Sequence, residues 1–143
     1  MIRPGAPVPD ISTVETLKHA LLEAEALLYT EEASGLRVDE MLRKLGIARQ
    51  VEARVTRHRN GPTLMDRLLG GQGREIGFLP VTAIRMYKDR GVVMVGPLPG
   101  EAQHYLEMIA VVSTNTRNRD IAWEFVRFCA EQGRPLLAAN GLN

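Results

Sequence analysis

Residues 26–46 read ALLYTEEASGLRVDEMLRKLG. The first five form a continuous apolar run with the length of a buried strand. From Ser34-Gly35 onward, apolar residues instead recur at helical spacing, as Val38, Met41, Leu42 and Leu45. Gly46 follows at the position where a helix commonly ends in a left-handed residue. The stretch therefore predicts a buried strand that leads directly into a helix.

The alternation of strand and helix continues on both sides of this stretch. Upstream, Ser12 and Glu15 form a capping-box pattern ahead of a helix that contains Leu17 and Leu21. Downstream, we expect strands at 51–56, 75–79 and 92–95, with helices at 62–69 and 80–88. Strands that alternate with short helices need crossover connections, which favours a largely parallel sheet. The expected fold class is therefore α/β.

The pattern changes after Gly100. Residues 105–113 predict one long strand, 118–132 one long helix and 135–139 a short last helix. One strand and two helices are too few to close a sheet. We therefore expect one α/β layer in residues 1–100 and an incomplete unit in residues 101–143.

Composition excludes several classes of partner. The chain has 18 Lys and Arg against 17 Asp and Glu. It therefore lacks the basic excess that is typical of proteins that bind nucleic acid or an anionic membrane surface. The locally basic run 54–59 is interpreted as a solvated strand edge. Cys129, the single cysteine, lies in an apolar stretch and is expected to be a buried core thiol.

Enzyme and metal motifs are not found in the sequence. Gly70-Gly71-Gln72-Gly73 resembles a phosphate loop only superficially, because it follows a predicted helix and precedes a strand. A solvent turn is the better interpretation. The histidines have no metal-ligand spacing; they are His19, His58 and His104. We therefore expect no catalytic residue, no metal and no cofactor.

Two strand-to-helix turns, at 30–35 and 78–82, are the candidate binding elements. In an α/β sheet, ligands bind at the carboxyl ends of the strands, where the free amides of helix N-termini bind anions. Ser34 can add a hydroxyl donor, and Gly35 lets the backbone approach closely. The simpler interpretation is that Ser34 only caps a helix. Spacing alone leaves both interpretations open.

The ordered set of segments along the chain resembles the molybdate-binding proteins of bacterial ABC importers. The resemblance rests on Arg3-Pro4-Gly5-Ala6 with 9–15, Ala33-Ser34-Gly35 with 42–46, Glu75-Ile76-Gly77-Phe78, Val95-Gly96-Pro97-Leu98-Pro99, 122–128 and 138–142. It implies a type II periplasmic-binding-protein-like fold. One α/β lobe would be complete, and the last strand and two helices would belong to the other lobe. It also implies that the first-lobe segment, with its hydroxyl ligands, is not in this chain.

The resemblance also implies a ligand set. Backbone amides at Ser34 and Leu79 would bind a tetrahedral oxyanion, with Gly35 beside the first of them. The family's tyrosine ligand falls near Glu107. Tyr105, two residues earlier, would lie on the same strand face and is the candidate in its place.

The function expected from these features is solute capture for an ABC-type importer, without chemistry on the ligand. Its partners would be a small oxyanion, the importer's membrane subunits if the chain is exported, and a second copy that covers the apolar strand and helix of the last third. The alternative is a solitary intracellular interaction or sensor module derived from such a lobe. The resemblance implies a periplasmic location. The first residues lack a hydrophobic signal core, which implies a cytoplasmic location if the chain is complete.

Overall fold

The computed structural model describes residues 1–142, and the chain divides into two compact units, Met1–Tyr105 and Leu106–Asn143. The division falls after Tyr105, whereas the sequence predicted a boundary near Gly100. The first unit contains α1 (Val14–Glu23), β1 (Ala26–Thr30), α2 (Ala33–Lys44), α3 (Ala48–Val51), η1 (Glu52–Arg54), β2 (Val55–His58), α4 (Gly61–Gly70), β3 (Glu75–Gly77), α5 (Val81–Arg85), η2 (Lys88–Arg90) and η3 (Gly100–Ala102). The second contains α6 (Arg119–Ala130) and α7 (Arg134–Ala139).

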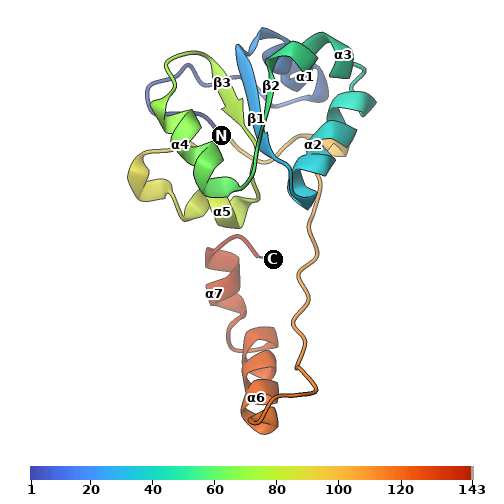
Figure 1. Ribbon diagram of the computed structural model, residues 1–143, viewed down its shortest axis with the longest axis vertical. Helices are drawn as coiled ribbons and strands as arrows, with labels where there is room; N and C mark the ends of the chain where they lie inside the picture. Colours follow the sequence, from blue (N-terminus) through green and yellow to red (C-terminus); the bar gives the residue numbers. More distant parts are fainter. Residues whose placement is uncertain (143) are drawn as a thin grey trace. The chain divides into compact units, whose positions relative to one another are not determined.

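The sheet of the first unit has the order β2-β1-β3 and is parallel throughout the described residues (Figure 1). Leu27 lies opposite Val55 on one side and Ile76 on the other. The mixed α/β class and the parallel sheet expected from the alternation of elements are thereby confirmed. That the sheet belongs to a type II lobe stays a prediction.

Helices cover both faces of this sheet. Successive side chains of β1 point to opposite faces and so pack in different cores. Leu27 and Tyr29 pack in one core with buried residues of α1, α2 and α3. Leu28 packs in a second core with Leu64, Met65 and Leu68 of α4 and Ile84 of α5. Since β1 is buried on both faces, it has the uninterrupted apolar character from which it was predicted.

Two predicted element starts are displaced. The capping box of α1 is formed by Thr13 and Thr16, each of whose side chains accepts the other's backbone amide at 3.1 Å, and not by Ser12 and Glu15. The strand predicted at 51–56 begins only at Val55, because residues 48–54 form α3 and η1. The first difference is a shift of the capping hydroxyl by one residue, from Ser12 to Thr13. The second arises because a short helical segment precedes the strand.

The basic run lies on β2, which is an edge strand of the described sheet, as predicted. Its charges are partly engaged in protein contacts. Arg54 donates to the carbonyl oxygens of Leu22 and Ala24, at 2.7 and 2.6 Å. Arg57 donates to Asp39 at 2.9 Å. These contacts join η1 to the end of α1 and β2 to α2.

The strand predicted at 92–95 is reduced to an isolated antiparallel bridge between Ile2 and Val93. The amide of each donates to the carbonyl of the other, at 2.9 and 3.0 Å. Beside it, Met1 exchanges two hydrogen bonds with Gly77, so the first residues continue the sheet past β3. Gly91 and Gly96, both at positive φ, flank the bridge and limit it to this length.

The second unit differs most from expectation. Residues 105–113, predicted as a long strand, form no strand in the described structure, and residues 104–112 donate no backbone–backbone hydrogen bond there. A strand needs a neighbour to pair with, and the described chain places none beside this segment. Cys129, expected to be buried, is only half-buried. The two predicted helices are present as α6 and α7.

The two-sided burial of β1 gives a testable prediction. Leu28→Ala should lower the free energy of unfolding by about 2–5 kcal/mol, because it removes a fully buried side chain and leaves a cavity. Leu36→Ala is the control, since Leu36 is 59% exposed on α2; its effect should stay within about 0.5 kcal/mol. Urea denaturation followed by circular dichroism measures both, and equal losses would contradict the assignment of the core.

Candidate functional site

The candidate site is the carboxyl edge of the sheet. Because β1, β2 and β3 are parallel, their last residues lie at the same edge, and α2, α4 and α5 all begin there (Figure 1). The expectation that the helices at Ser34 and Pro80 start on one edge is therefore confirmed. The two outer strands lie on opposite sides of β1, with α2 on one face of the sheet and α4 and α5 on the other. The carboxyl edge of a parallel sheet is where α/β proteins commonly bind ligands.

The start of α2 supplies two backbone donors. Within the described residues, the amides of Ala33 and Ser34 donate to no protein acceptor. The N-cap residue is Glu32, whose side chain makes no capping hydrogen bond, so Ser34 is not the cap that its spacing allowed. The Ser34 hydroxyl instead lies 3.2 Å from the Thr30 hydroxyl. Ser34 therefore contributes an available amide and a hydroxyl that is held against the end of β1.

Gly35 explains how α2 comes so close to the end of the strand. A Cβ atom at this position would lie 1.6 Å from the Thr30 carbonyl oxygen, which is a clash with backbone. Its own amide donates to the Glu32 carbonyl at 2.9 Å. The structure thus gives Gly35 a packing role, since its amide is already used. Direct contact of Gly35 with a ligand stays a prediction.

Leu79 lies in the turn after β3. The amide of Phe78 donates to the Leu28 carbonyl at 2.8 Å, which extends the pairing with β1 by one residue. The amide of Leu79 then has no acceptor among the described residues. Its side chain covers the start of α4, because a Cβ atom at Gly61 would lie 3.7 Å from Leu79 Cδ1. The turns after β2 and β3 therefore meet at this edge.

Tyr105 is the predicted ligand residue that the structure does not bring to these turns. It is 83% exposed and lies outside any described strand, at the end of the first unit. The structure gathers Ser34, Gly35 and Leu79 at one edge and leaves Tyr105 on an extended segment.

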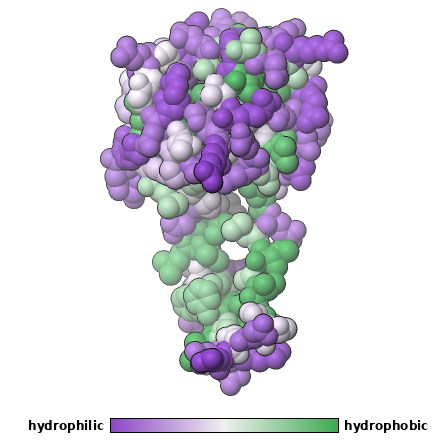
Figure 2. All heavy atoms as spheres, in the orientation of Figure 1, coloured by the Kyte–Doolittle hydropathy of each residue, from purple (hydrophilic) through white to green (hydrophobic). Residues whose placement is uncertain are grey.

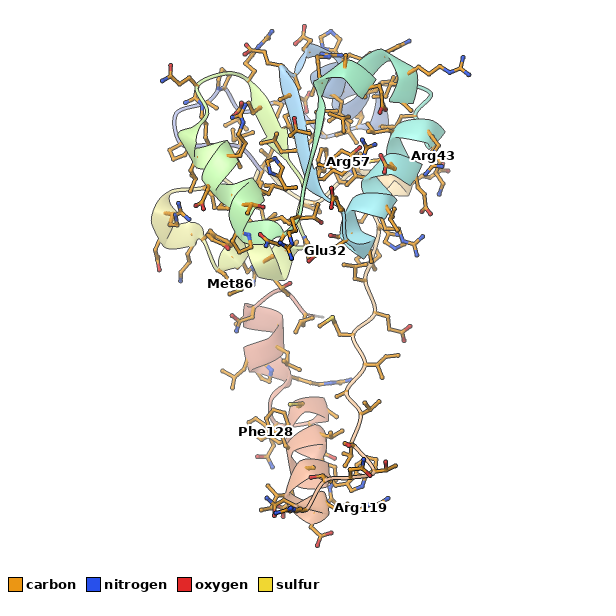
Figure 3. All side chains as sticks on the ribbon, viewed as in Figure 1. Glu32, Arg43, Arg57, Met86, Arg119 and Phe128 are labelled. Atoms are coloured by element: carbon orange, nitrogen blue, oxygen red, sulfur yellow. The ribbon has the colours of Figure 1, made fainter. Side chains whose placement is uncertain are left out.

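The charges at the edge are mixed. Glu31 and Glu32, both exposed, precede α2, and Arg59, also exposed, follows β2. Figure 3 shows Glu32 at the start of α2. Carboxylates are stabilised by the helix dipole at this position. They also oppose the approach of a second anion, so the amides and the carboxylates of this edge have opposite effects on an oxyanion.

Sequence reasoning did not find the polar network that holds α2 in place. The Tyr29 hydroxyl donates to Asp39 at 2.6 Å, and burial raises the pKa of that hydroxyl. The Arg57 guanidinium also contacts Asp39 and lies 5.3 Å from the centre of the Tyr29 ring. These residues are 10 and 18 positions apart, and no local sequence pattern links them.

His58 is another group that the sequence did not single out. It is the last residue of β2, and its Nε2 atom is buried without a hydrogen-bond partner in the described part of the chain. Burial, followed by the nearby positive charge of Arg67, lowers its pKa. The lowered pKa favours the neutral form of this imidazole.

A cavity of about 410 Å³ lies elsewhere in the first unit, between the lead-in and α1. None of the predicted ligand residues lines it; its walls come from Ile2, 6–10, Thr16, His19, Ala20, Glu23, Ala24 and 74–76. The carboxyl edge is therefore an open surface in this chain, not an enclosed cavity. The edge is a candidate site because its strands are parallel and its helix starts have available amides.

Comparisons with known proteins give one match. The model of the family described as bacterial extracellular solute-binding protein matches residues 1–143. Neither the curated proteins nor the solved structures gave a significant match. In residues 1–142, none of the helices has the length and apolar character needed to cross a membrane.

The close approach of α2 to β1 can be tested at Gly35. Gly35→Ala should destabilise the protein by about 1–3 kcal/mol or more, because Thr30 or the helix must move to admit the methyl group. Gly70→Ala is the matched control, since it lies in a helix with nothing within 4 Å of the new Cβ. The control should be neutral or slightly stabilising. The measurement is the midpoint of urea unfolding of each variant. Similar midpoints for the two variants would refute the packing role of Gly35.

The lowered pKa of His58 predicts a pH dependence of stability. The unfolded state takes up a proton near its ordinary pKa of about 6.5, whereas the folded state does so only at lower pH. The stabilising difference is present above pH 6.5 and is lost as the pH falls through the folded-state pKa. Thermal melts from pH 7.5 to 5 should show a smaller loss of stability for His58→Gln than for the wild type. His104→Gln, at an exposed position, should follow the wild type.

Proposed function

Because the chain belongs to the bacterial extracellular solute-binding protein family, we propose that it captures a small oxyanion for an ABC-type importer, by binding and without chemistry on the ligand. The observation that carries the proposal is the presence of unused backbone amides at Ser34 and Leu79 on the same sheet edge. Backbone amides bind oxyanions without any requirement for lysine or arginine.

The α2 helix is the principal electrostatic contributor in this proposal. It is 12 residues long, and its positive end opens on the edge. The amides of Ala33 and Ser34 are directed outward from its first turn, and the Ser34 hydroxyl lies beside them. Gly35 allows this turn to sit directly on the end of β1. These groups form the kind of donor set that suits a tetrahedral anion.

Two features limit the affinity that we expect of this chain. The available donors of Ser34 and Leu79 belong to one sheet edge, so an oxyanion bound there keeps much of its hydration. Glu31 and Glu32 add like charges near the donors, and like charges repel across such short distances. We therefore propose weak binding by the chain alone. Tyr105 as a further ligand is part of the same proposal.

The choice of oxyanion within the proposal is molybdate, on the resemblance of the segments around Ser34 and Glu75. Sulfate is the natural comparison because it has the same tetrahedral shape and charge. The alternative function, a solitary interaction or sensor module that uses this lobe without solute capture, requires no donors at the edge. A titration of the edge amides distinguishes the two functions.

Family membership also bears on partners and location. Solute-binding proteins of importers deliver a small ligand to membrane subunits, and the matched family is extracellular by its description. We propose the same partners and a periplasmic or extracellular location for this protein. The homodimer expected from the sequence is part of the proposal as well, and its interface is a separate question from ligand capture.

The proposed site gives a binding prediction. Molybdate added to the ¹⁵N-labelled protein should shift the amide signals of Ser34 and Leu79 saturably, with a weak affinity in the millimolar range, about −4 kcal/mol. Ser34→Pro deletes the donor amide and should abolish the shifts. Ser34→Ala keeps the amide and removes only the hydroxyl, so it should retain most of the binding.

The outcomes separate the alternatives. No saturable shift with either molybdate or sulfate would refute oxyanion capture and favour the interaction module. Shifts confined to residues outside 30–35 and 78–82 would refute this site. Low-micromolar affinity by calorimetry, about −8 kcal/mol, would contradict the argument that the edge alone binds weakly.

A further inference from the structure

The cavity of the first unit lies at the amino edge of the sheet. It has a volume of about 410 Å³, and all its lining residues belong to the first unit. Its walls include Ala24, which precedes β1, and 74–76, where β3 begins. The proposed oxyanion site lies at the carboxyl ends of the same strands. The cavity is therefore a separate site, and its volume falls within the range of about 300–1,000 Å³ that is typical of small-molecule sites.

The first residues of the chain build one wall of this cavity. Met1 exchanges two backbone hydrogen bonds with Gly77, and Arg3 Nε donates to the Gly73 carbonyl at 3.3 Å. The chain therefore runs antiparallel to β3, from the carboxyl end of that strand towards its amino end. This course leads to residues 6–10, which line the cavity. The wall is thus held by hydrogen bonds within the first unit.

The inner surface of the cavity is largely apolar. Ile2 and Ile76 contribute from the two antiparallel segments, and Ala20 and Ala24 contribute from the side of α1. The two alanines are short, which leaves space between α1 and residues 6–10. Elsewhere the first unit presents mainly hydrophilic atoms, as Figure 2 shows for one face. The lining therefore favours a ligand with an apolar body.

Glu75 supplies polar groups to the same cavity. It lines the cavity although the residue is only 5% exposed. Its side chain is turned towards α4, where Oε1 lies 2.6 Å from Arg67 Nη2, so its backbone is the part that can face the cavity. Two residues later, the amide and carbonyl of Gly77 are directed away from β1 and bond to Met1. Because the direction of these groups alternates along a strand, Glu75 directs its own amide and carbonyl the same way.

These two backbone groups of Glu75 have no partner among the described residues. Outside the pairing of the three strands, none of the hydrogen bonds of residues 1–142 uses either group. Buried backbone donors and acceptors are nearly always paired, with protein, water or a ligand. An outward amide and carbonyl of one residue are the groups to which a peptide unit binds when a strand is added to a sheet. They therefore favour a ligand that contains an amide.

We propose that this cavity binds a small uncharged peptide unit with an apolar side chain, through hydrogen bonds to the backbone of Glu75. The ligand's carbonyl accepts from the Glu75 amide, its N–H donates to the Glu75 carbonyl, and its side chain packs against Ile76 and Ala20.

The charges at the rim of the cavity are consistent with a neutral ligand. Arg74 lies 3.9 Å from Glu23 and 3.8 Å from Glu25. Glu23 also lies 3.7 Å from His19 on the next turn of α1. Arg74 and Glu23 already face opposite charges, so a carboxylate or an ammonium group gains less here than the buried amide and carbonyl of Glu75 offer to a neutral amide.

A titration of the full ¹⁵N-labelled chain with N-acetyl-leucinamide tests the proposal. The Glu75 amide signal should move downfield saturably, with an affinity in the millimolar range, because this amide gains an acceptor. N-acetyl-glycinamide has the same amide groups without the apolar side chain, and isoamyl alcohol has the apolar chain without an amide. Each should bind roughly tenfold more weakly, since each lacks either the buried side chain or the hydrogen bonds.

Two variants locate the binding. Ala20→Leu fills the cavity and should abolish the shifts. Lys18→Leu is the matched control, because it adds the same side chain to α1 at a position that does not line the cavity, and it should bind as the wild type does. The comparison of the three probes uses the wild type, so it does not depend on the folding of either variant.

Three results would overturn the proposal: no saturable shift of Glu75, equal binding of the alcohol and the amide, or unchanged binding by a folded Ala20→Leu variant. The proposed oxyanion site is read from different signals, those of Ser34 and Leu79, and with a different ligand. Failure of one site is therefore distinguishable from failure of the other.

Discussion

The fold depends on the burial of β1 from both sides. Its backbone pairs with β2 on one edge and β3 on the other, while Leu27, Leu28 and Tyr29 are completely buried between two helical layers. A strand in this position cannot have a polar side chain without a partner: the Tyr29 hydroxyl donates to Asp39, and the buried Thr30 hydroxyl lies 3.2 Å from that of Ser34. The strands β2 and β3 pair with it, and helices α1 to α5 pack with its side chains in the two cores.

The end of β1 transmits that constraint to the candidate site. The Thr30 carbonyl occupies the space that a side chain at Gly35 would need, so the first turn of α2 is fixed directly against the strand. The Asp39 contacts with Tyr29 and Arg57 fix the middle of the same helix. With two points held, the direction of α2 is set, and its amides at Ala33 and Ser34 open at the sheet edge. A binding edge of this kind is thus a consequence of core packing, and it needs no special residue apart from the glycine.

Sequence patterns predicted the parts of the fold that local periodicity controls. The strand at 26–30 and the helix that follows it were predicted from apolar spacing, and the shared edge of α2 and α5 from the repeated strand-to-helix order. Elements that depend on distant partners were not. Residues 92–95 have strand character, but only Val93 pairs, with Ile2 from the other end of the unit. The Tyr29–Asp39–Arg57 network joins residues from three elements, so no spacing rule could identify it. At the site, Ser34 was predicted from a helix start, whereas the packing reason for Gly35 needed the position of Thr30.

The two units show why an apolar pattern predicts the need for burial more reliably than it predicts what satisfies that need. Leu28 and Ile109 both lie in short apolar runs, and each run was predicted as a buried strand. Leu28 has a neighbouring strand on each side and the helices α4 and α5 over its side chain, so it is buried in the first unit. Ile109 has α6 and α7 as its only later elements in the described chain, and it remains 78% exposed. Because the free energy of burying an apolar side chain is the same in both places, the difference lies in the supply of partners. The apolar run at 108–112 therefore has the same need for burial, which the described elements after it do not meet.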